Sequence, residues 1–506
     1  MPSQARADTA ASQTRRNRAG REKRGLEDPA HGQDGQGDPL SELAEAIAAR
    51  AAAEARALVH AAADLLAAEP GEHGLLEAIE RAAQRTAASI GLAALTGVLD
   101  RAGAEAPPRA PCPEAGHPAR LVARRPKTVR TLLGEVDTVR GYYHCSTCKR
   151  GFAPLDSRLG TTGTSLSPGL ARACARAGAE MPYATSRRFI AEVTGLDLAS
   201  TSTLARTTRA AGTRARDLIA AEHAAALRAP RPVPAASQDG PDRCYVVLDG
   251  TGAPMLPCEC ADRAGKDPEA NGGRAGTREV KIACLFTQTE TDPDTGEPIQ
   301  DPGSATYVST FEPAGAFGAR AKAEYLRRDF DLIRQPIVLG DGAKWIWTIA
   351  NDHFPAATQI VDYFHAREHL ADLTKILAPA LNAAGIDPAA FEQALVDHLD
   401  LGHTEAIAAA VADLDLPNRT PDLTGPAATE IGYFTGNHHR MQYAEFQANG
   451  YYIGSGPVEA ACNTIVKQRA KRAGMHWTIA GLDPVLALRT LHQSGRGQLL
   501  WPTPQT

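Results

Sequence analysis

The sequence predicts a multidomain α/β protein in which helical segments and a small β-ribbon are followed by an α/β core that an all-helical insertion interrupts. Long Ala/Leu/Glu/Arg-rich segments before residue 104 repeat apolar positions at helical spacing, and a Pro-rich linker at 227–242 marks a domain boundary. Beyond it, short apolar runs bounded by glycine alternate with amphipathic segments, as strands alternate with helices. A chain of 506 residues that is 43% hydrophobic has room for about three domains.

Composition restricts the classes of partner. The formal net charge of −5 argues against a chain that is basic throughout, so local patches decide which partners are attracted. Residues 1–39 are polar and Gly-rich and contain RRNRAGREKR at 15–24, which predicts a disordered basic tail. We find no apolar run of about eighteen residues and no cleavable leader, so we expect no membrane insertion and a cytoplasmic protein.

Two helices are predicted within residues 40–105. Both segments have helix-forming composition and periodicity, and the sequence EPGEHG at 69–74 separates them. We expect a helical hairpin that serves oligomerisation or contacts DNA.

Residues 106–160 predict a small zinc-binding module. The nine cysteines are scattered and form no disulfide framework, so close cysteine spacings in a reducing compartment indicate metal binding. Alternating residues on both sides of Gly134 predict a β-hairpin that ends in a Cys-x-x-Cys knuckle. Tetrahedral Zn²⁺ takes N and S ligands in two such pairs, and the candidate ligands of one structural Zn²⁺ are Cys112, His117, Cys145 and Cys148. Unligated surface thiols are the alternative.

The same module is locally basic. Its cations outnumber its carboxylates, as a surface that meets phosphates would require, although any one of them could be simply solvated. They are Arg120, Arg124, Arg125, Lys127, Arg130 and Arg140. Residues 165–226 then predict a short helix, a turn at 195–197 and a second helix opening with Ser/Thr. This outline is like a helix-turn-helix, and many αα-hairpins share it.

After the linker, residues 243–365 predict three strands, a helix, a strand, a helix and a strand. The strands are predicted at 244–249, 280–286, 305–311, 335–341 and 358–364. This is the order of an RNase-H-like domain. Residues 366–450 begin with an entirely helical pattern, and residues 451–495 contain a final basic helix.

Two carboxylates follow strands of this predicted sheet. Asp249 ends the first strand in VVLDGTG and Asp341 ends the fourth in LGDGAKWIW; in this topology the two strands are neighbours. Glu459, in the first turn of a later helix, is a third candidate ligand. Carboxylates placed together repel one another unless divalent cations lie between them. Each also has a structural interpretation: Asp249 ends a strand, Asp341 caps a helix, and Glu459 is a first-turn acid that the positive end of a helix dipole stabilises.

From Cys112 to about Trp477, the chain resembles the DDE transposases of bacterial insertion sequences, specifically the ISKra group, which is similar in layout to Mutator and hAT transposases. The residues that carry the resemblance are VVLDGTG, LGDGAKWIW, DYFHAREHL and GSGPVEAACNTIVKQRAKRAGMHW. The resemblance implies an RNase-H-like core interrupted by an all-helical insertion, with Asp249, Asp341 and Glu459 as the metal-binding triad. In the first zinc pair, Ala115 replaces an expected cysteine and His117 follows two residues later.

The resemblance also implies the chemistry and the partners. Mutator and hAT enzymes carry an Asp-or-Cys, x, x, His motif, which Asp362 and His365 match, and we assign these two residues to active-site support. Two Mg²⁺ or Mn²⁺ ions held by the triad would serve cleavage of a phosphodiester and transfer of its 3′ end. The partners implied are double-stranded DNA, as transposon inverted-repeat ends and as target, and further copies of the chain assembled on it.

The helix that carries Glu459 continues with basic residues that can reach a DNA backbone, or form a solvated face. These are Lys467, Arg469, Lys471 and Arg472. Trp345 and Trp347 could stack on a flipped base, but aromatic residues at helical spacing beside a strand are more often core, and we leave them out of the site.

Three other functions compete with a transposase. A zinc-ribbon DNA-binding regulator that has lost transposition would leave the triad idle, and an RNase-H-like nuclease without strand transfer would share the same active site. The sequence HAREH at 365–369 fits the His-x-x-Glu-His pattern of inverted zinc peptidases. That pattern needs a helix interior, whereas we expect His365 to follow a strand directly.

Overall fold

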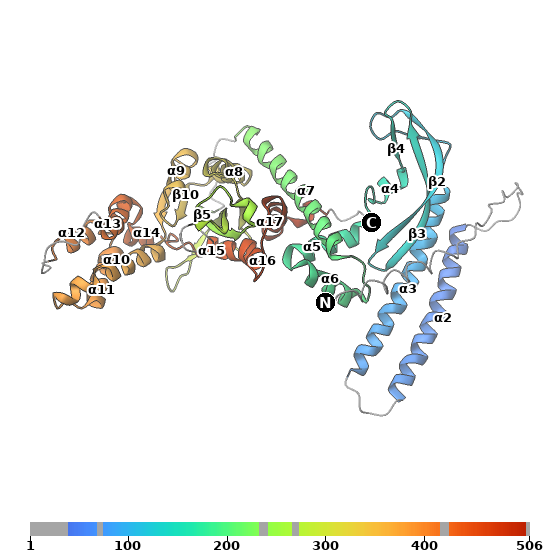
Figure 1. Cartoon of the computed structure of the whole chain (residues 1–506), viewed down its shortest axis with the longest axis horizontal. Coiled ribbons are helices and arrows are strands. Elements are labelled where there is room, and N and C mark those ends of the chain that lie inside the picture. The colour runs from blue at the N-terminus through green and yellow to red at the C-terminus, as the bar shows by residue number, and fades with distance from the viewer. Residues whose placement is uncertain (1–38, 68–73, 232–240, 266–272, 415–424, 502–506) are drawn as a thin grey trace, which may run out of the picture. The chain divides into compact units, whose positions relative to one another are not determined.

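The computed structural model describes residues 39–67, 74–231, 241–265, 273–414 and 425–501 (Figure 1). Clustering of contacts divides the chain into two compact units, Met1–Val98 and Leu99–Thr506. The predicted disordered tail lies outside the described residues except for Pro39, and most of the predicted linker lies outside them too. No helix in the described ranges combines the length and the apolar character needed to cross a membrane.

The first unit contains the predicted pair of helices, α2 (Pro39–Ala67) and most of α3 (Leu75–Ala104). Polar side chains link them: Arg50 donates to Ser89 Oγ over 2.9 Å, and Ser89 Oγ donates to Glu54 over 3.1 Å. Helix-forming composition and this lateral pairing account for two helices of about equal length.

An antiparallel ribbon follows in the second unit, with strand order β1-β2-β3-β4. The strands are β1 (Arg109–Pro111), β2 (Pro118–Thr131), β3 (Gly134–Cys145) and β4 (Arg150–Phe152), and the short helix α4 (Pro154–Arg158) comes next. A tight turn joins β2 to β3, and Gly134 occupies φ +133°, which other residues rarely adopt. The core of the ribbon is small, so the two long strands depend on few buried apolar contacts.

Three helices follow the ribbon: α5 (Pro168–Glu180), α6 (Tyr183–Thr194) and α7 (Thr201–Arg228). Gly195 ends α6 in the left-handed conformation, and the Ser200 side chain caps α7 by accepting from the Thr203 amide. The predicted helix, turn and helix are therefore present. α7 continues two residues into the range predicted as linker.

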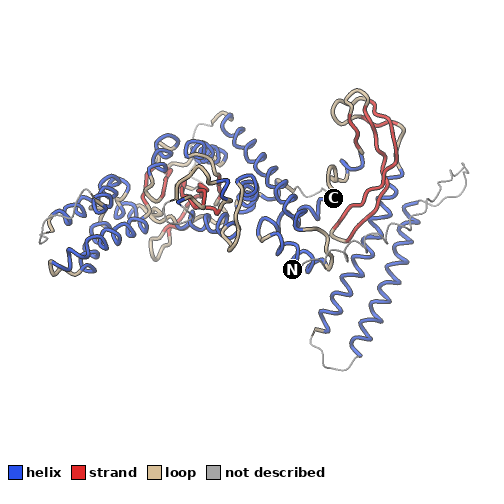
Figure 2. Tube along the Cα trace, viewed as in Figure 1, coloured by secondary structure: helices blue, strands red, loops and turns tan. Residues whose placement is uncertain are grey.

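The central sheet has five strands in the order β11-β10-β5-β6-β9, which Figure 2 shows in red within the surrounding helices. The strands are β5 (Arg243–Pro254), β6 (Thr277–Gln288), β9 (Thr306–Thr310), β10 (Gln335–Gly340) and β11 (Thr358–Val361). β5, β6 and β9 are antiparallel neighbours, whereas β10 pairs in parallel with both β5 and β11. All five predicted strands are present, and the first and fourth are neighbours as expected. The fifth, predicted at 358–364, ends at Val361, because Asp362 caps α10 and the helix begins at Tyr363.

Helices surround this mixed sheet. α8 (Ala314–Arg327) packs on β6, β9 and α9 (Lys344–His353), and α17 (Ile479–Gln493) packs against edge strand β9 and α7. A small hairpin of β7 (Glu290–Thr291) and β8 (Pro298–Ile299) lies in the polar insert between β6 and β9. Trp347 is 6% exposed within the main core, which confirms the core interpretation of that residue.

A helical region follows β11, as predicted. Its helices are α10 (Tyr363–Ala383), α11 (Pro388–Asp400), α12 (Thr404–Ala412), α13 (Pro426–Asn437) and α14 (Tyr443–Ala448). The final helical stretch comprises α15 (Gly456–Ala461), a π-helical segment (Cys462–Lys467) and α16 (Gln468–Ala470) before α17. Single 3₁₀ turns occur at Pro257–Glu259, Phe330–Leu332, His438–Arg440 and Gly497–Leu499.

Candidate metal-binding sites

The ribbon brings three cysteines together at one end. The Sγ atoms of Cys112, Cys145 and Cys148 lie within 4.8 Å of one another, and this group could hold a metal ion such as zinc. Cys112 and Cys145 are buried and Cys148 is half-buried. Among the described residues, no other group of three His, Cys, Asp or Glu ligand atoms is this compact.

Two hairpin turns produce the group. Cys112 opens the β1–β2 loop, where its amide donates to the carbonyl of His117 over 2.8 Å. Cys145 ends β3, and the Cys148 amide donates to its Sγ over 3.4 Å. Lys149 then closes the β3–β4 turn with φ +55°. The wide Cys112-to-His117 spacing is therefore the length of a hairpin loop that faces the knuckle.

His117 lies beside the cysteines and not among them. Its Nδ1 atom is 3.4 Å from Cys148 Sγ, but it does not belong to the group whose ligand atoms are all within 4.8 Å. Three of the four predicted zinc ligands are therefore assembled, and His117 is adjacent to them.

The thiols have unequal pKa values. Backbone amides of the knuckle lower the pKa of Cys145 to about 7, with the Cys148 amide the largest contribution, whereas burial raises the pKa of Cys148 to about 11. Amides that point at a sulfur stabilise its thiolate, which is the form that binds metal.

Asp249 and Asp341 lie side by side at the central sheet. Leu248 of β5 pairs with Gly340 of β10 in a parallel register, so Asp249, the next residue of β5, lies beside Asp341, which follows β10. β5 continues to Pro254, so the expectation that Asp249 ends its strand is wrong. The Asp249 carboxylate accepts from the Gly250 amide over 2.6 Å. The parallel pairing therefore produces the predicted juxtaposition.

The cap interpretation of Asp341 is wrong in its simple form. Ala343 occupies the N-cap position of α9, and Asp341 Oδ1 accepts from the Ala343 amide over 2.9 Å in a local turn before the helix. Gly342 has φ +93°, and a Cβ there would lie 2.5 Å from the Tyr433 ring.

Glu459 is exposed and is oriented through two other side chains. Ser455 Oγ donates to Glu459 Oε1 over 2.9 Å and also donates to Asp362 Oδ2. The Ser455 amide donates to the same Asp362 oxygen over 3.1 Å, and Asp362 Oδ1 accepts from the Phe364 and His365 amides. Asp362 is 2% exposed, and its oxygens are occupied by these donors. It therefore supports Glu459 and caps α10.

The three carboxylates influence one another without forming a closed cage. Burial raises the pKa of Asp249, and the negative charges of Asp341 and Glu459 raise it further. Their oxygens nevertheless do not form a group within 4.8 Å, as the cysteine sulfurs do. Like charges in a partly desolvated site repel, and a cation between them would remove that repulsion.

Cys462 was missed by the sequence reasoning. Its buried thiol donates to Asp249 Oδ2 over 3.1 Å, which lowers the pKa of that carboxyl against the effect of burial. Cys462 follows Glu459 by three residues, so helical spacing could have placed it on the same face.

The His365 side chain contacts a glutamate on its own helix, α10. Its Nδ1 is 3.2 Å from Glu368 Oε2, while His369 Nδ1 is 2.6 Å from Glu430 Oε2 and stacks on Tyr433. The sequence HAREH lies inside α10, so the expectation that His365 directly follows a strand is wrong. The peptidase interpretation still lacks support, because these groups form no compact ligand set in the described chain.

Two of the side chains predicted to contact DNA are instead buried or paired with another residue of the protein. Arg469 is 1% exposed between the rings of Tyr183 and Trp477, so its prediction as a surface contact is wrong. Lys127 pairs with Asp156 over 3.1 Å. Burial here comes from helices and turns distant in sequence, which charge patterning does not reveal.

The remaining predicted cations differ in accessibility. Arg130 donates to Ser165 Oγ over 2.9 Å and is half-buried. Five are exposed to solvent: Arg124, Arg125, Lys467, Lys471 and Arg472. Lys471 also donates to Thr251 Oγ1 over 3.1 Å, which places its ammonium group beside β5, at a residue two positions after Asp249.

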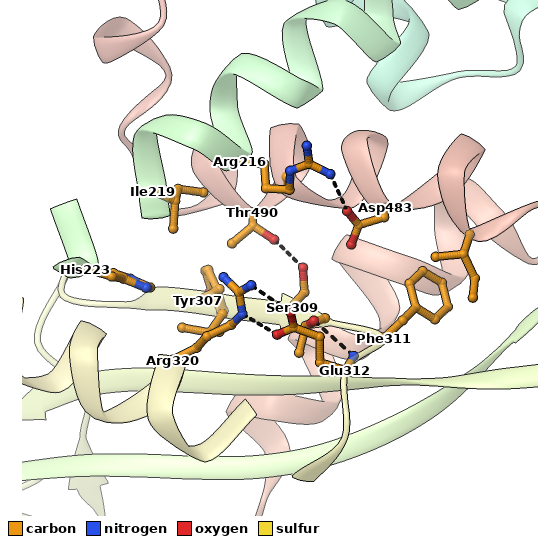
Figure 3. Close-up of a pocket in the computed structure, with 14 residues that line it drawn as sticks. Arg216, Ile219, His223, Tyr307, Ser309, Phe311, Glu312, Arg320, Asp483 and Thr490 are labelled. Atoms are coloured by element: carbon orange, nitrogen blue, oxygen red, sulfur yellow. Dashed lines mark hydrogen bonds and ion pairs between the residues drawn. The ribbon is translucent and has the colours of Figure 1, made fainter. Parts of the chain in front are cut away.

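A separate cavity of about 490 Å³ lies between α7, α17 and edge strand β9 (Figure 3). Its charged groups pair with one another: Arg320 binds Glu312 through two contacts of 2.5 and 2.9 Å, and Arg216 approaches Asp483 at 3.5 Å. No predicted site residue lines it. The cavity is therefore distinct from the candidate site formed by Asp249, Asp341 and Glu459.

The chain matches no protein-family model, and a search of curated proteins finds no match either.

Proposed function

We propose that the chain is a DDE-type transposase that binds transposon ends, cleaves phosphodiester bonds in duplex DNA and transfers the freed 3′ end to target DNA. The observation that carries the proposal is the convergence of Asp249, Asp341 and Glu459, in which the charges of the other two raise the pKa of Asp249. Functional carboxylates are often gathered despite such a cost.

The sheet supports an RNase-H-like core for this proposal. Three antiparallel strands, β5, β6 and β9, are followed by two parallel strands, β10 and β11, with the first and fourth adjacent. Asp341 directly follows β10, at the carboxyl end where ligands of open α/β sheets bind, and Asp249 lies within β5 at the point where the parallel pairing with β10 ends. The helical region between β11 and α15 corresponds to the proposed insertion.

The donor set fits Mg²⁺ or Mn²⁺. Carboxylate oxygens suit these hard cations. Burial, and then the charges of Asp341 and Glu459, raise the pKa of Asp249, and a bound cation would offset both effects. Asp249, Asp341 and Glu459 would hold two such ions, and these would supply Lewis-acid stabilisation for phosphodiester cleavage and transfer.

The other residues of the chain contribute position and charge. Ser455 and Asp362 orient Glu459, and exposed Lys467, Lys471 and Arg472 extend from the acidic helix towards a DNA backbone. The ribbon, held by zinc, would contact transposon ends through Arg124 and Arg125. Assembly of several copies on DNA would bring two ends together.

A cleavage assay with Asp341→Asn tests the proposal. Asparagine keeps the acceptor for the Ala343 amide but removes the anionic charge, so folding and DNA binding should persist while cleavage falls by orders of magnitude. The substrate is duplex DNA from both flanks of the chain's own gene, with Mg²⁺ or with EDTA. Asp352→Asn, at an exposed position of α9, is the matched control.

The outcomes separate the alternatives. Mg²⁺-dependent nicking that Asp341→Asn abolishes supports the catalytic role, and joined products in addition distinguish a transposase from a nuclease. Specific binding to the flanks with no cleavage in any metal would instead favour the DNA-binding regulator. Wild-type cleavage rates in Asp341→Asn would remove the carboxylates from the mechanism.

A further inference from the structure

The helix that bears Glu459 contains a rare conformation. α15 changes after Ala461 into a π-helical segment at Cys462–Lys467, and α-helical geometry resumes at Gln468. The Gln468 amide donates to the carbonyl of Asn463, five residues back. The Thr464 carbonyl, four residues back, therefore loses its usual donor. Single π-helical turns contain one extra residue and frequently occur at functional sites.

Arg489 of α17 supplies the missing donor. Its Nη2 donates to the Thr464 carbonyl, and its Nε donates to the Ile465 carbonyl over 2.9 Å. Arg489 is 1% exposed, so water does not replace these bonds. The rigid planar fork of a guanidinium can serve two adjacent carbonyls at once, whereas a lysine ammonium cannot reproduce that geometry.

The same guanidinium also binds the carboxyl end of α5. Arg489 Nη1 donates to the Ala179 carbonyl over 2.8 Å and to Glu180 Oε2 over 2.5 Å. Arg469 makes a parallel contact, since its Nε donates to the Gly178 carbonyl over 3.0 Å. The last carbonyls of a helix lack internal partners and favour positive charge, so both contacts are favourable.

The acidic helix is therefore held at two ends. Ser455 and Asp362 hold its start at the sheet, and Arg469 holds its end on α5. The π-helical segment accommodates the extra residue between these two attachments. One residue corresponds to about 100° of rotation in an α-helix, so closing the segment would rotate Glu459 and Cys462 relative to Asp249.

We infer that Arg489 is a positioning residue for Glu459, which it orients by holding the π-helical segment open and joining it to α5. This inference rests on the proposed function, because Glu459 is its target. It also connects α5 with the acidic residue. Displacement of α5 would be transmitted to the acidic helix through two buried side chains, Arg489 and Arg469.

The test compares Arg489→Met with Arg328→Met in the full-length protein. Arg328 also donates to backbone carbonyls, those of Leu285 and Ser304, but none of its hydrogen bonds joins the acidic helix or α5. Arg489→Met should retain DNA binding and KM for DNA, while kcat should fall about 10- to 100-fold, as for outer partners of metal ligands. The half-saturating Mg²⁺ concentration should rise. Arg328→Met should change neither quantity per folded molecule.

Labelling of Cys462 provides a readout that does not need activity. The thiol is buried against Asp249, and rotation of the helix should expose it, so the rate of its alkylation by N-ethylmaleimide should rise in Arg489→Met and not in Arg328→Met. Arg489→Lys, which keeps the charge without the fork, should show the same two changes and replaces Arg489→Met if that variant does not fold. Glu180→Gln leaves both contacts to the π-helical segment and should behave as wild type.

The two proposals fail separately. If the wild-type protein does not cleave DNA but Cys462 labelling increases as stated, the proposed function is wrong and the positioning of this helix stands. If the wild type cleaves and Arg489→Met or Arg489→Lys matches it in kcat and in Cys462 labelling, the inference is overturned.

Discussion

The cysteine group of the ribbon and the carboxylates of the central sheet differ in how closely the folded chain by itself brings the candidate ligand atoms together. The three cysteine sulfurs lie within 4.8 Å of one another, while the three carboxylates remain farther apart and raise the pKa of Asp249. Protonated thiols are neutral and can pack together, whereas ionised carboxylates repel. A metal is therefore expected to stabilise the fold of the ribbon, but to tighten the arrangement of side chains on a sheet that is already folded.

The largest expected effect is at the cysteine group. Purified protein should contain about one Zn²⁺ per chain, and Cys145→Ser combined with Cys148→Ser should remove it and unfold the ribbon, because its core is small and metal binding is coupled to folding. Metal analysis and limited proteolysis of residues 106–160 measure this. Cys258→Ser, an exposed cysteine outside the group, is the control. Full zinc content in the double variant would show that these cysteines do not hold the metal.

The next effect concerns the orientation of Glu459. Ser455→Ala removes the hydroxyl that joins Glu459 to Asp362, and we expect DNA cleavage to fall about 10- to 100-fold with little loss of stability. Single-turnover rates and thermal unfolding measure the two quantities. Ser309→Ala, whose hydroxyl contacts Thr490 at edge strand β9, is the matched control. Equal rates in both variants would show that the carboxylates need no outer support.

A smaller effect is expected on stability without metal. Because Asp249 has a raised pKa in the folded state, the folded protein holds that proton more tightly than the unfolded chain does, where the ordinary value is 3.8. The carboxylate therefore destabilises the fold fully above the folded pKa, and this penalty disappears below 3.8. Asp249→Asn should raise Tm in EDTA at pH 7 and raise it less at pH 4.5.

Mg²⁺ provides the complementary measurement. It should raise Tm of the wild type at pH 7, and it should raise Tm of Asp249→Asn less, because binding to the native state stabilises it. A lower Tm for Asp249→Asn at pH 7 in EDTA would show that this carboxylate is satisfied without a cation, and the contrast between the two sites would disappear.

The smallest effect concerns the basic face of the ribbon. Arg124→Ala and Arg125→Ala should each reduce the slope of log K for DNA against log salt concentration by about 1, as expected for loss of one phosphate contact. Lys127→Ala should leave the slope unchanged, because Asp156 already pairs with that lysine. A salt-titration binding assay distinguishes them. A change in slope for Lys127→Ala alone would reverse the assignment.

Much of the fold was predictable because local pattern reports on burial. The apolar runs before Asp249 and Asp341 predicted two strands, and both strands are buried in the sheet. Order along the chain then predicted their adjacency. The Cys-x-x-Cys spacing predicted the knuckle in the same way, since two ligands on one tight turn need no distant information.

The details of the carboxylate site were harder to predict from the sequence. Asp362 was assigned to support by resemblance, but its saturation by four donors depends on Ser455, which is 93 residues away. The bond from Cys462 to Asp249 joins residues 213 positions apart, and no local pattern predicts it. The cap interpretation of Asp341 failed by two residues, because Asp341 forms a turn with the Ala343 amide before the helix begins.

The sequence by itself determined where most strands and helices form, which cysteines share a turn and which carboxylates lie on or directly after neighbouring strands, because these depend on periodicity and on short spacings. Only the tertiary structure decided which charges are available. Arg469 and Arg472 are three residues apart on one basic segment, yet Arg469 is buried against α5 and Arg472 is exposed. The physical reason is that burial and pairing depend on the elements that pack against a side chain, and those elements come from distant parts of the chain.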